Sequence, residues 1–156
     1  MKLYDKLEIK HLITDLFKKL VMMYPDTFSE LKIDFNGRYG TGICVEYGDI
    51  VIDLAEIRDM PVNMHRFSTE TEMKEMAKYN KNITIPEYVL LHEIGHYLDF
   101  LENPKLFYEN KEDKEDEMSY VNARIRESDF AQELYRTTIL ESRANRNAYL
   151  MARHIV

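Results

Sequence analysis

The run His92-Glu93-Ile94-Gly95-His96 combines two metal ligands with an acid–base group. Residues four apart lie on one face of a helix, so both imidazoles can reach the same metal ion. Glu93 lies beside that face, within reach of a water on the metal. Zinc lowers the pKa of its bound water toward ~7, and a carboxylate can then take the proton. The pattern predicts a zinc hydrolase with His92 and His96 as ligands and Glu93 as general base.

The neighbouring residues predict that the motif lies in the middle of a buried helix from about Pro86 to Leu101. Thr84 suits the N-cap and Pro86 the first turn. Apolar residues follow at helical spacing, namely Val89, Leu90, Ile94, Leu98 and Leu101. Asn103-Pro104 predicts the end of the helix. Gly95 costs roughly 1 kcal/mol relative to alanine, so either another backbone packs close to that turn or the glycine is merely tolerated.

Two histidines and one water leave tetrahedral zinc one ligand short. The metzincin pattern requires a glycine three residues after the second histidine, where this chain has Asp99. That class is therefore not favoured. One straight helix rarely offers three ligands to one ion, so Asp99 is expected to be an outer hydrogen-bond partner of the site or a surface charge.

A later segment supplies a better third ligand. Ser128 suits an N-cap, and the chain from there onward predicts one long helix. One face of that helix carries Glu141, Ala144, Asn145 and Ala148. The small alanines allow close approach to Gly95, and the Asn145 side-chain oxygen can accept a bond from the outer N–H of a ligating histidine. We expect Glu141 to be the third ligand; the alternative is an exposed glutamate paired with an arginine.

Taken together, His92-Glu93-x-x-His96 and Glu141-x-x-x-Asn145 resemble the gluzincins, whose third zinc ligand is a glutamate on a second helix. More narrowly, Glu141-x-x-Ala144-Asn145-x-x-Ala148 resembles the second motif of the ImmA/IrrE-type peptidases, small zinc proteins of bacteria and mobile elements. The resemblance covers about residues 86–101 and 141–148, and Asn147 stands where that family usually has Phe. It implies an α+β fold, zinc on His92, His96 and Glu141, catalysis by Glu93, and cleavage of intracellular proteins such as transcriptional repressors.

The remaining chain predicts a single α+β domain over residues 1–156. Residues 1–24 form an amphipathic pattern that favours a helix packed on the domain's own sheet, because acids are mixed with its lysines; a membrane-surface helix is the alternative. Alternating apolar residues predict three short strands near residues 31–35, 43–47 and 50–54. Turns at Asn36-Gly37 and Gly48-Asp49 predict that the sheet is antiparallel. The resemblance implies that an edge strand beside the metal helix pairs with extended substrate.

Two connecting regions could shape a cleft. A short polar helix is expected from about Ser68 to Tyr79, and the methionines nearby are expected in the core rather than in a lid. The charged run 109–117 predicts a solvated loop or helix start, with a substrate-gating role as the alternative.

The amino-acid composition argues against several classes of function for this chain. The chain has 156 residues, 45% of them hydrophobic, which suits one domain with a real core. Its net charge of −7 without a basic tract argues against nucleic acid as a partner. A single cysteine, Cys44, excludes an internal disulfide framework. Because neither a signal peptide nor an apolar run of about 18 residues is present, we expect a cytoplasmic protein that acts on a protein or peptide substrate.

Peptide hydrolysis also needs a donor for the developing oxyanion. The available candidates are Tyr97, Tyr120, Arg143, His65 and His154, of which Tyr120 and His154 are preferred as catalytic residues. Two other functions remain open. A metal-dependent binding module would need only ligands, so the presence of Glu93 disfavours it. A structural protein with a chance motif would bind no metal.

Overall fold

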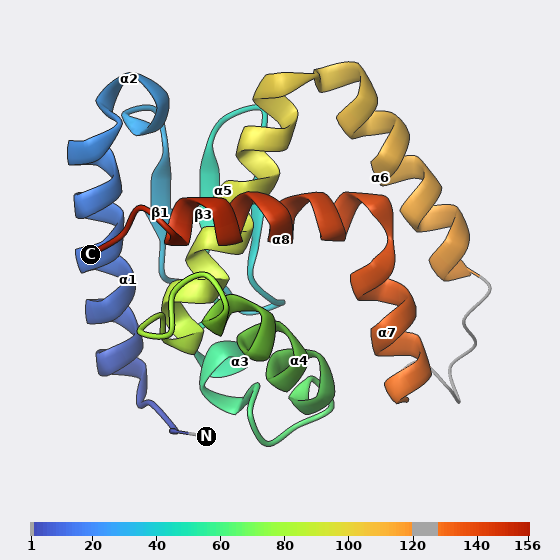
Figure 1. The fold of residues 1–156 in the computed structure, drawn as a ribbon, viewed down its shortest axis with the longest axis horizontal. Coiled ribbons are helices and arrows are strands. Elements are labelled where there is room, and N and C mark those ends of the chain that lie inside the picture. The colour runs from blue at the N-terminus through green and yellow to red at the C-terminus, as the bar shows by residue number, and fades with distance from the viewer. Residues whose placement is uncertain (1, 120–127) are drawn as a thin grey trace.

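The structure is a computed structural model that describes residues 2–119 and 128–156. Its helices are α1 (Lys6–Met23), α2 (Pro25–Phe28), α3 (Leu54–Asp59), α4 (Arg66–Ala77), α5 (Ile85–Glu102), α6 (Pro104–Ser119), α7 (Asp129–Thr137) and α8 (Ile139–Ala152). Its strands are β1 (Lys32–Asp34), β2 (Gly42–Cys44) and β3 (Asp49–Val51). Helix α5 runs through the middle of the molecule, α8 crosses it, and α6 and α7 extend to one side (Figure 1). The predicted α+β class is confirmed.

The prediction of an antiparallel sheet is wrong for one strand pair. The strand order is β1-β3-β2, with β1 parallel and β2 antiparallel to β3. The most apolar strand occupies the middle, and both Ile50 and Ile52 are fully buried. Gly37 lies so close to β3 that a Cβ there would be 2.8 Å from a Val51 side-chain carbon. The Asn36-Gly37 segment therefore passes along β3 instead of folding β1 back onto β2.

The predicted N-terminal helix is present, but it packs mainly against α5 and α3 and not on the sheet as predicted. Asp5 caps α1, and the Asp5 and Glu8 side chains each accept a hydrogen bond from the other residue's backbone N–H. The stripe that faces the core consists of Ile9, Ile13, Leu16 and Leu20, all buried. Leu3 and Leu7, at the start of the amphipathic segment 1–24, are exposed. Within the described residues, no helix is both long and apolar enough to cross a membrane.

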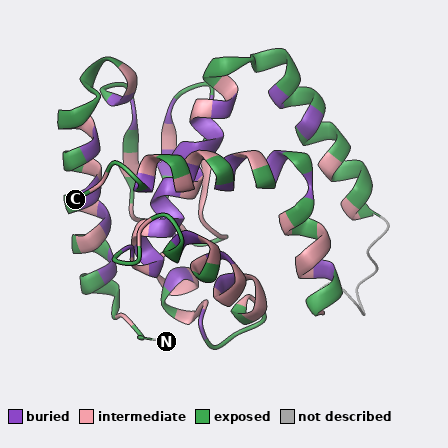
Figure 2. Ribbon diagram, in the orientation of Figure 1, coloured by how far each residue is buried: buried purple, intermediate pink, exposed green. Residues whose placement is uncertain are grey.

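The predicted motif helix is confirmed as α5. Thr84 caps it, and Glu87 completes the reciprocal pair of bonds at its start. Asn103 follows its last residue, as predicted, and α6 begins directly at Pro104. Most of α5 is buried, as the purple ribbon at the centre of the molecule shows (Figure 2). A helix that is buried on nearly all sides can hold polar groups only where they have partners, so its histidines are expected to be bonded.

The prediction of one long C-terminal helix is wrong. Ser128 does cap α7, accepting a bond from the Ala131 N–H, but the helix ends at Thr137. Thr138 has an extended backbone (φ −58°, ψ 149°), and its buried hydroxyl donates to the Tyr135 carbonyl. The chain changes direction between α7 and α8 (Figure 1). This break places Glu141 in the first turn of α8, over α5.

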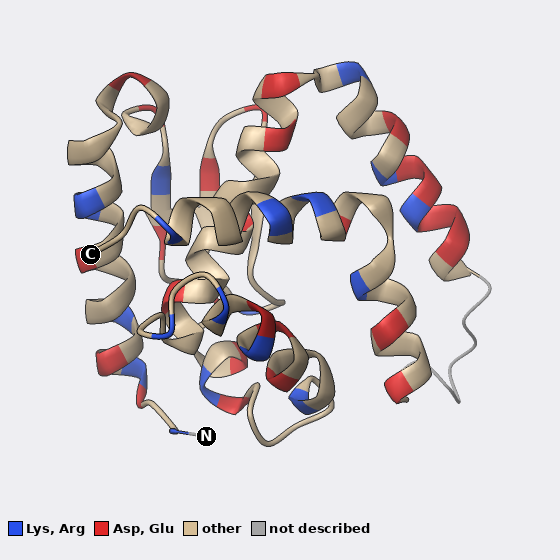
Figure 3. Ribbon diagram, viewed as in Figure 1, with Lys and Arg blue, Asp and Glu red and all other residues tan. Residues whose placement is uncertain are grey.

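The connecting regions are helical. Met76 is buried, and Met60 and Met73 pack against the core, as predicted, whereas Met64 is exposed. The charged run 109–117 lies within α6, where acidic and basic residues follow one another along the helix (Figure 3).

Helices α5 and α8 approach closely at Gly95. A Cβ on Gly95 would lie 2.2 Å from the Ala144 carbonyl oxygen. Non-bonded carbon and oxygen atoms cannot lie this close, so the approach of the α8 backbone requires a glycine at position 95. Asn147 adds a hydrogen bond across the same contact, from its side-chain amide to the Gly95 carbonyl at 3.0 Å. The close approach brings the histidines of α5 within reach of α8.

Gly95→Ala is expected to lower the free energy of unfolding by more than about 2 kcal/mol. Alanine favours a helix by roughly 1 kcal/mol over glycine, but overpacking against a backbone costs as much as about 3 kcal/mol or more. Urea unfolding would measure the difference. Gly42→Ala is the matched control, because a Cβ there meets no described atom within 4 Å. Equal stability of the Gly95→Ala and wild-type proteins would contradict the close contact.

Candidate metal centre

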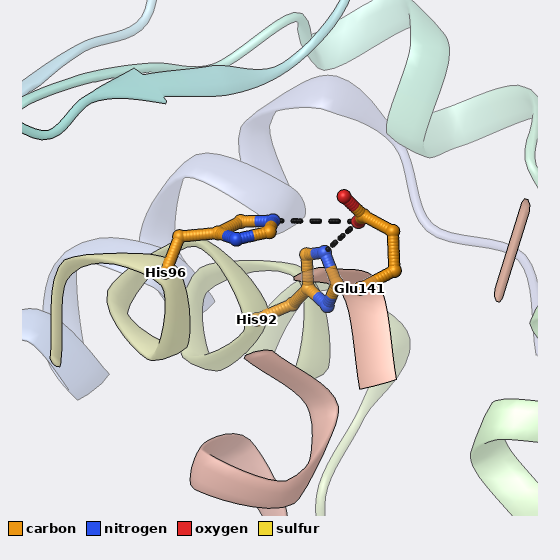
Figure 4. Close-up of side chains that lie close together, drawn as sticks. All are labelled: His92, His96 and Glu141. Atoms are coloured by element: carbon orange, nitrogen blue, oxygen red, sulfur yellow. Dashed lines mark hydrogen bonds and ion pairs between the residues drawn. The ribbon is translucent and has the colours of Figure 1, made fainter. Parts of the chain in front are cut away.

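Three ligand atoms from two helices converge on one point (Figure 4). The Nε2 atom of His92 lies 3.0 Å from Oε1 of Glu141, and the Nε2 atom of His96 lies 3.3 Å from the same oxygen. All three ligand atoms lie within 4.8 Å of one another, so the cluster could hold a metal ion. The three residues are those expected from the sequence, and Glu141 is only 2% exposed.

Asn145 orients the first histidine, as predicted. Its Oδ1 atom lies 2.7 Å from Nδ1 of His92 and also accepts a hydrogen bond from the Tyr88 hydroxyl at 2.6 Å. An amide oxygen can only accept hydrogen bonds, so Nδ1 of His92 is the donor. Nε2 therefore points toward Glu141 and the metal position. Tyr88 was not anticipated, although it lies one helical turn before His92.

Asp99 is a buried ion-pair partner between the two helices. It is 2% exposed, and its Oδ1 accepts a hydrogen bond from Nε of Arg143 at 2.6 Å. The same arginine reaches Glu102 at 3.2 Å. Neither expected role of Asp99 is found: it is buried and so is not a surface charge, and its described partner is Arg143 and not a histidine of the cluster. Arg143, one of the oxyanion candidates, joins α8 to α5 through these two acids.

The electrostatics of the cluster favour a charged His92–Glu141 pair when no metal is present. Burial opposes the charged imidazolium, but the hydrogen bond to Glu141 and its negative charge outweigh burial and raise the pKa of His92 to about 9. Burial also opposes ionisation of Glu141, yet hydrogen bonds from His92 and His96 hold the pKa of this carboxyl well below its usual range. Both nitrogens of His92 face acceptors, which agrees with a ring that carries two protons. A metal ion would replace the proton on Nε2.

Metal-free protein, prepared with a chelator, is expected to lose stability as the pH rises from 6.5 to 9. The raised pKa of His92 contributes stability that is fully present below pH 6.5 and is lost as the pH rises through about 9. The lowered pKa of Glu141 contributes stability above pH 4.5 that is lost as the pH falls. Each pKa unit corresponds to about 1.4 kcal/mol, so the loss on the alkaline side is on the order of 3 kcal/mol. Urea unfolding at the two pH values measures it, and unchanged stability would contradict the ion pair.

Glu93 lies where two cavities meet. The larger cavity has a volume of about 360 Å³ and the smaller about 340 Å³, and both are lined by Thr41, Glu93, Tyr135 and Glu141. Glu93 is 8% exposed. Burial raises the pKa of its carboxyl, although the neighbouring His92 and His96 act to lower it. A carboxylate with a raised pKa beside a metal position is suited to accept a proton near neutral pH.

The two cavities differ in chemistry. Most of the exposed wall surface of the larger one is apolar, as at Met60 and Val89, although Glu56, Glu72 and Arg136 also line it; we call it the apolar cavity. The smaller one is lined by β2 and by Glu46, Tyr108, Lys111 and Lys114; we call it the polar cavity. The edge strand β2 lines the polar cavity together with Glu93, His96 and Glu141, so it borders the metal cluster.

Of the two preferred oxyanion candidates, the structure describes only His154, which lies away from the cluster. Tyr120 lies outside the described residues. His154 is exposed beyond the C-terminal end of α8, whereas Glu141 is in the first turn of that helix. Thirteen residues of helical rise separate them by roughly 20 Å. His154 is therefore not part of the site.

Tyr135 takes a place that the sequence did not indicate. It lines both cavities, and desolvation of its hydroxyl, followed by the negative charges of Glu141 and Glu93, raises its pKa well above the usual range. In one unbroken helix Tyr135 would lie about 240° around the axis from Glu141, on another face. Only the break at Thr138 brings its hydroxyl toward the cluster, so no spacing pattern could have identified it. His65, another candidate, lines the apolar cavity.

Comparisons of the chain with family models, curated proteins and solved structures found no match.

Proposed function

We propose that the protein is a zinc-dependent metallopeptidase that hydrolyses peptide bonds of an intracellular protein, with a transcriptional regulator as one class of substrate. The observation that carries this proposal is the convergence of His92, His96 and Glu141 beside the buried Glu93, in a cleft bordered by a free strand edge. A ligand set without an adjacent base would suit a binding or structural site equally well. Glu93 makes hydrolysis the better explanation.

The donor set fits zinc. Two imidazole nitrogens and one carboxylate oxygen form a set typical of catalytic zinc, with a fourth position left for water. Asn145 holds His92 with Nε2 toward the cluster, the outer hydrogen bond that ligating histidines commonly make. When bound, zinc would polarise the scissile carbonyl and lower the pKa of a water molecule.

The protein's own residues supply the proton transfers. Glu93 takes the proton of the attacking water and then delivers it to the leaving amine. Its burial excludes bulk water and raises its pKa toward the range in which both steps are possible. Tyr135 lines both cavities, and its hydroxyl carries its proton at neutral pH as an ordinary tyrosine does, so it can donate a hydrogen bond to the developing oxyanion.

The shape of the cleft favours an extended substrate. Among the residues that the structure describes, β2 pairs only with β3, so its outer edge could bind a peptide beside Glu93 as an added strand. Gly42 leaves space on this strand, since a Cβ there would meet no described atom within 4 Å. The apolar cavity then accepts one bulky apolar side chain of the substrate next to the scissile bond.

Mass spectrometry of a peptide library incubated with the zinc-loaded protein tests the proposal. We expect cleavage next to bulky apolar residues, abolished by a chelator and restored by added zinc. Absence of cleavage from a protein that holds zinc in full would contradict the peptidase function and favour a metal-dependent binding module.

A further inference from the structure

The two oxygens of Glu141 face different partners. Oε1 faces the Nε2 atoms of His92 and His96 at 3.0 and 3.3 Å. Oε2 accepts a hydrogen bond from the ammonium group of Lys114 at 3.1 Å. The carboxylate is thus divided between a metal-facing oxygen and a lysine-bound oxygen.

Lys114 is held in this position by two neighbouring helices. It projects from α6, pairs with Glu141 of α8, and places its ammonium 4.9 Å from the centre of the Tyr135 ring of α7. Its side chain is only 21% exposed. Lys111 lies one turn earlier on α6 and lines the same polar cavity, but within residues 2–119 and 128–156 it makes no ion pair with Glu141.

Burial makes this ion pair more than a surface contact. The Glu141 side chain is 2% exposed, so an oxygen that lost the Lys114 ammonium there would lose a charged partner that water could not readily replace. The nearest compensation for such an oxygen would be the metal itself. A carboxylate that binds a metal through both oxygens adds one more donor, and catalytic zinc needs that position for water.

We propose that Lys114 is a positioning residue that restricts Glu141 to binding the metal through Oε1 alone, an inference that rests on the proposed function. By holding Oε2 in a charge-assisted hydrogen bond, the ammonium keeps the coordination number low and a position open for water. Lys114 therefore determines how many donors Glu141 provides, without being a ligand itself.

Visible absorption of the cobalt-substituted protein tests this role. Four-coordinate Co²⁺ absorbs visible light more strongly than Co²⁺ with five or six ligands, so the spectrum reports the coordination number. The test variant is Lys114→Met, which keeps the length of the side chain and a high helix propensity. Lys111→Met is the matched control. We expect the absorption per bound cobalt to fall about two-fold or more in Lys114→Met, and to match the wild type in Lys111→Met.

The outcomes separate this inference from the proposed function. A Lys114→Met protein that binds cobalt with the wild-type spectrum would overturn the role of Lys114 and leave the metal centre intact. A wild-type protein that binds neither cobalt nor zinc would overturn both. The expected spectral change in a protein that cleaves no peptide would support the role of Lys114 and count against the peptidase activity alone.

Discussion

Glu93→Gln is expected to lower kcat about 10²–10⁴-fold while leaving the zinc content unchanged. Glutamine matches the shape of glutamate, but it cannot take a proton from water or deliver one to the leaving amine. Glu93 is 8% exposed and lies where the apolar and polar cavities meet, so bulk water is poorly placed to replace it. Peptidase assays at saturating substrate, together with elemental analysis of the same samples, measure both quantities.

Glu102→Gln is the matched control for this experiment. Glu102 lies on the same helix, and its side chain is 69% exposed, where it pairs with Arg143. Its replacement should change kcat by less than about two-fold, as is usual for surface positions. Full activity of a zinc-loaded Glu93→Gln protein would exclude Glu93 as the general base.

Glu141→Ala is expected to weaken zinc binding by more than about 100-fold, the upper range seen when only an outer partner of a ligand is lost. Glu141 is the one ligand that comes from α8, and it is also the residue that both histidines face. Its removal leaves two histidines on a single helix, too few donors for a tight zinc site. Competition with a chromogenic chelator measures the affinity.

Glu112→Ala provides the comparison for that variant. Glu112 is an exposed residue of α6, so its replacement should leave the affinity for zinc unchanged. If Glu141→Ala bound zinc as tightly as the wild type, the third ligand would have to be a residue other than Glu141.

Local signals in the sequence were sufficient to predict the motif helix and the three residues of the cluster that could hold a metal ion. Thr84, Pro86 and Asn103 mark the ends of α5 because capping and helix termination depend on neighbouring residues. Glu141 and Asn145 could be assigned because their spacing fixes a shared helix face. Gly95 was informative because a glycine inside a helix is costly unless another backbone requires it.

The features that the sequence could not predict depend on contacts between distant segments. The order of the strands depends on which strand has a neighbour on both sides. This strand is β3, and its central position is set by the assembly of the whole core. Thr138 is compatible with either a helix or an extended backbone, so the break between α7 and α8 has no signal of its own. Tyr135 reaches the cluster because the chain breaks between α7 and α8. Lys114 reaches it because α6 packs against both of these helices.

Elemental analysis of the wild-type protein, purified without added zinc, tests the central claim most directly. A metal centre built from His92, His96 and Glu141 predicts about one zinc ion per chain. A protein that contains no metal, and takes up none when zinc is supplied, would contradict the metal centre and with it the proposed peptidase.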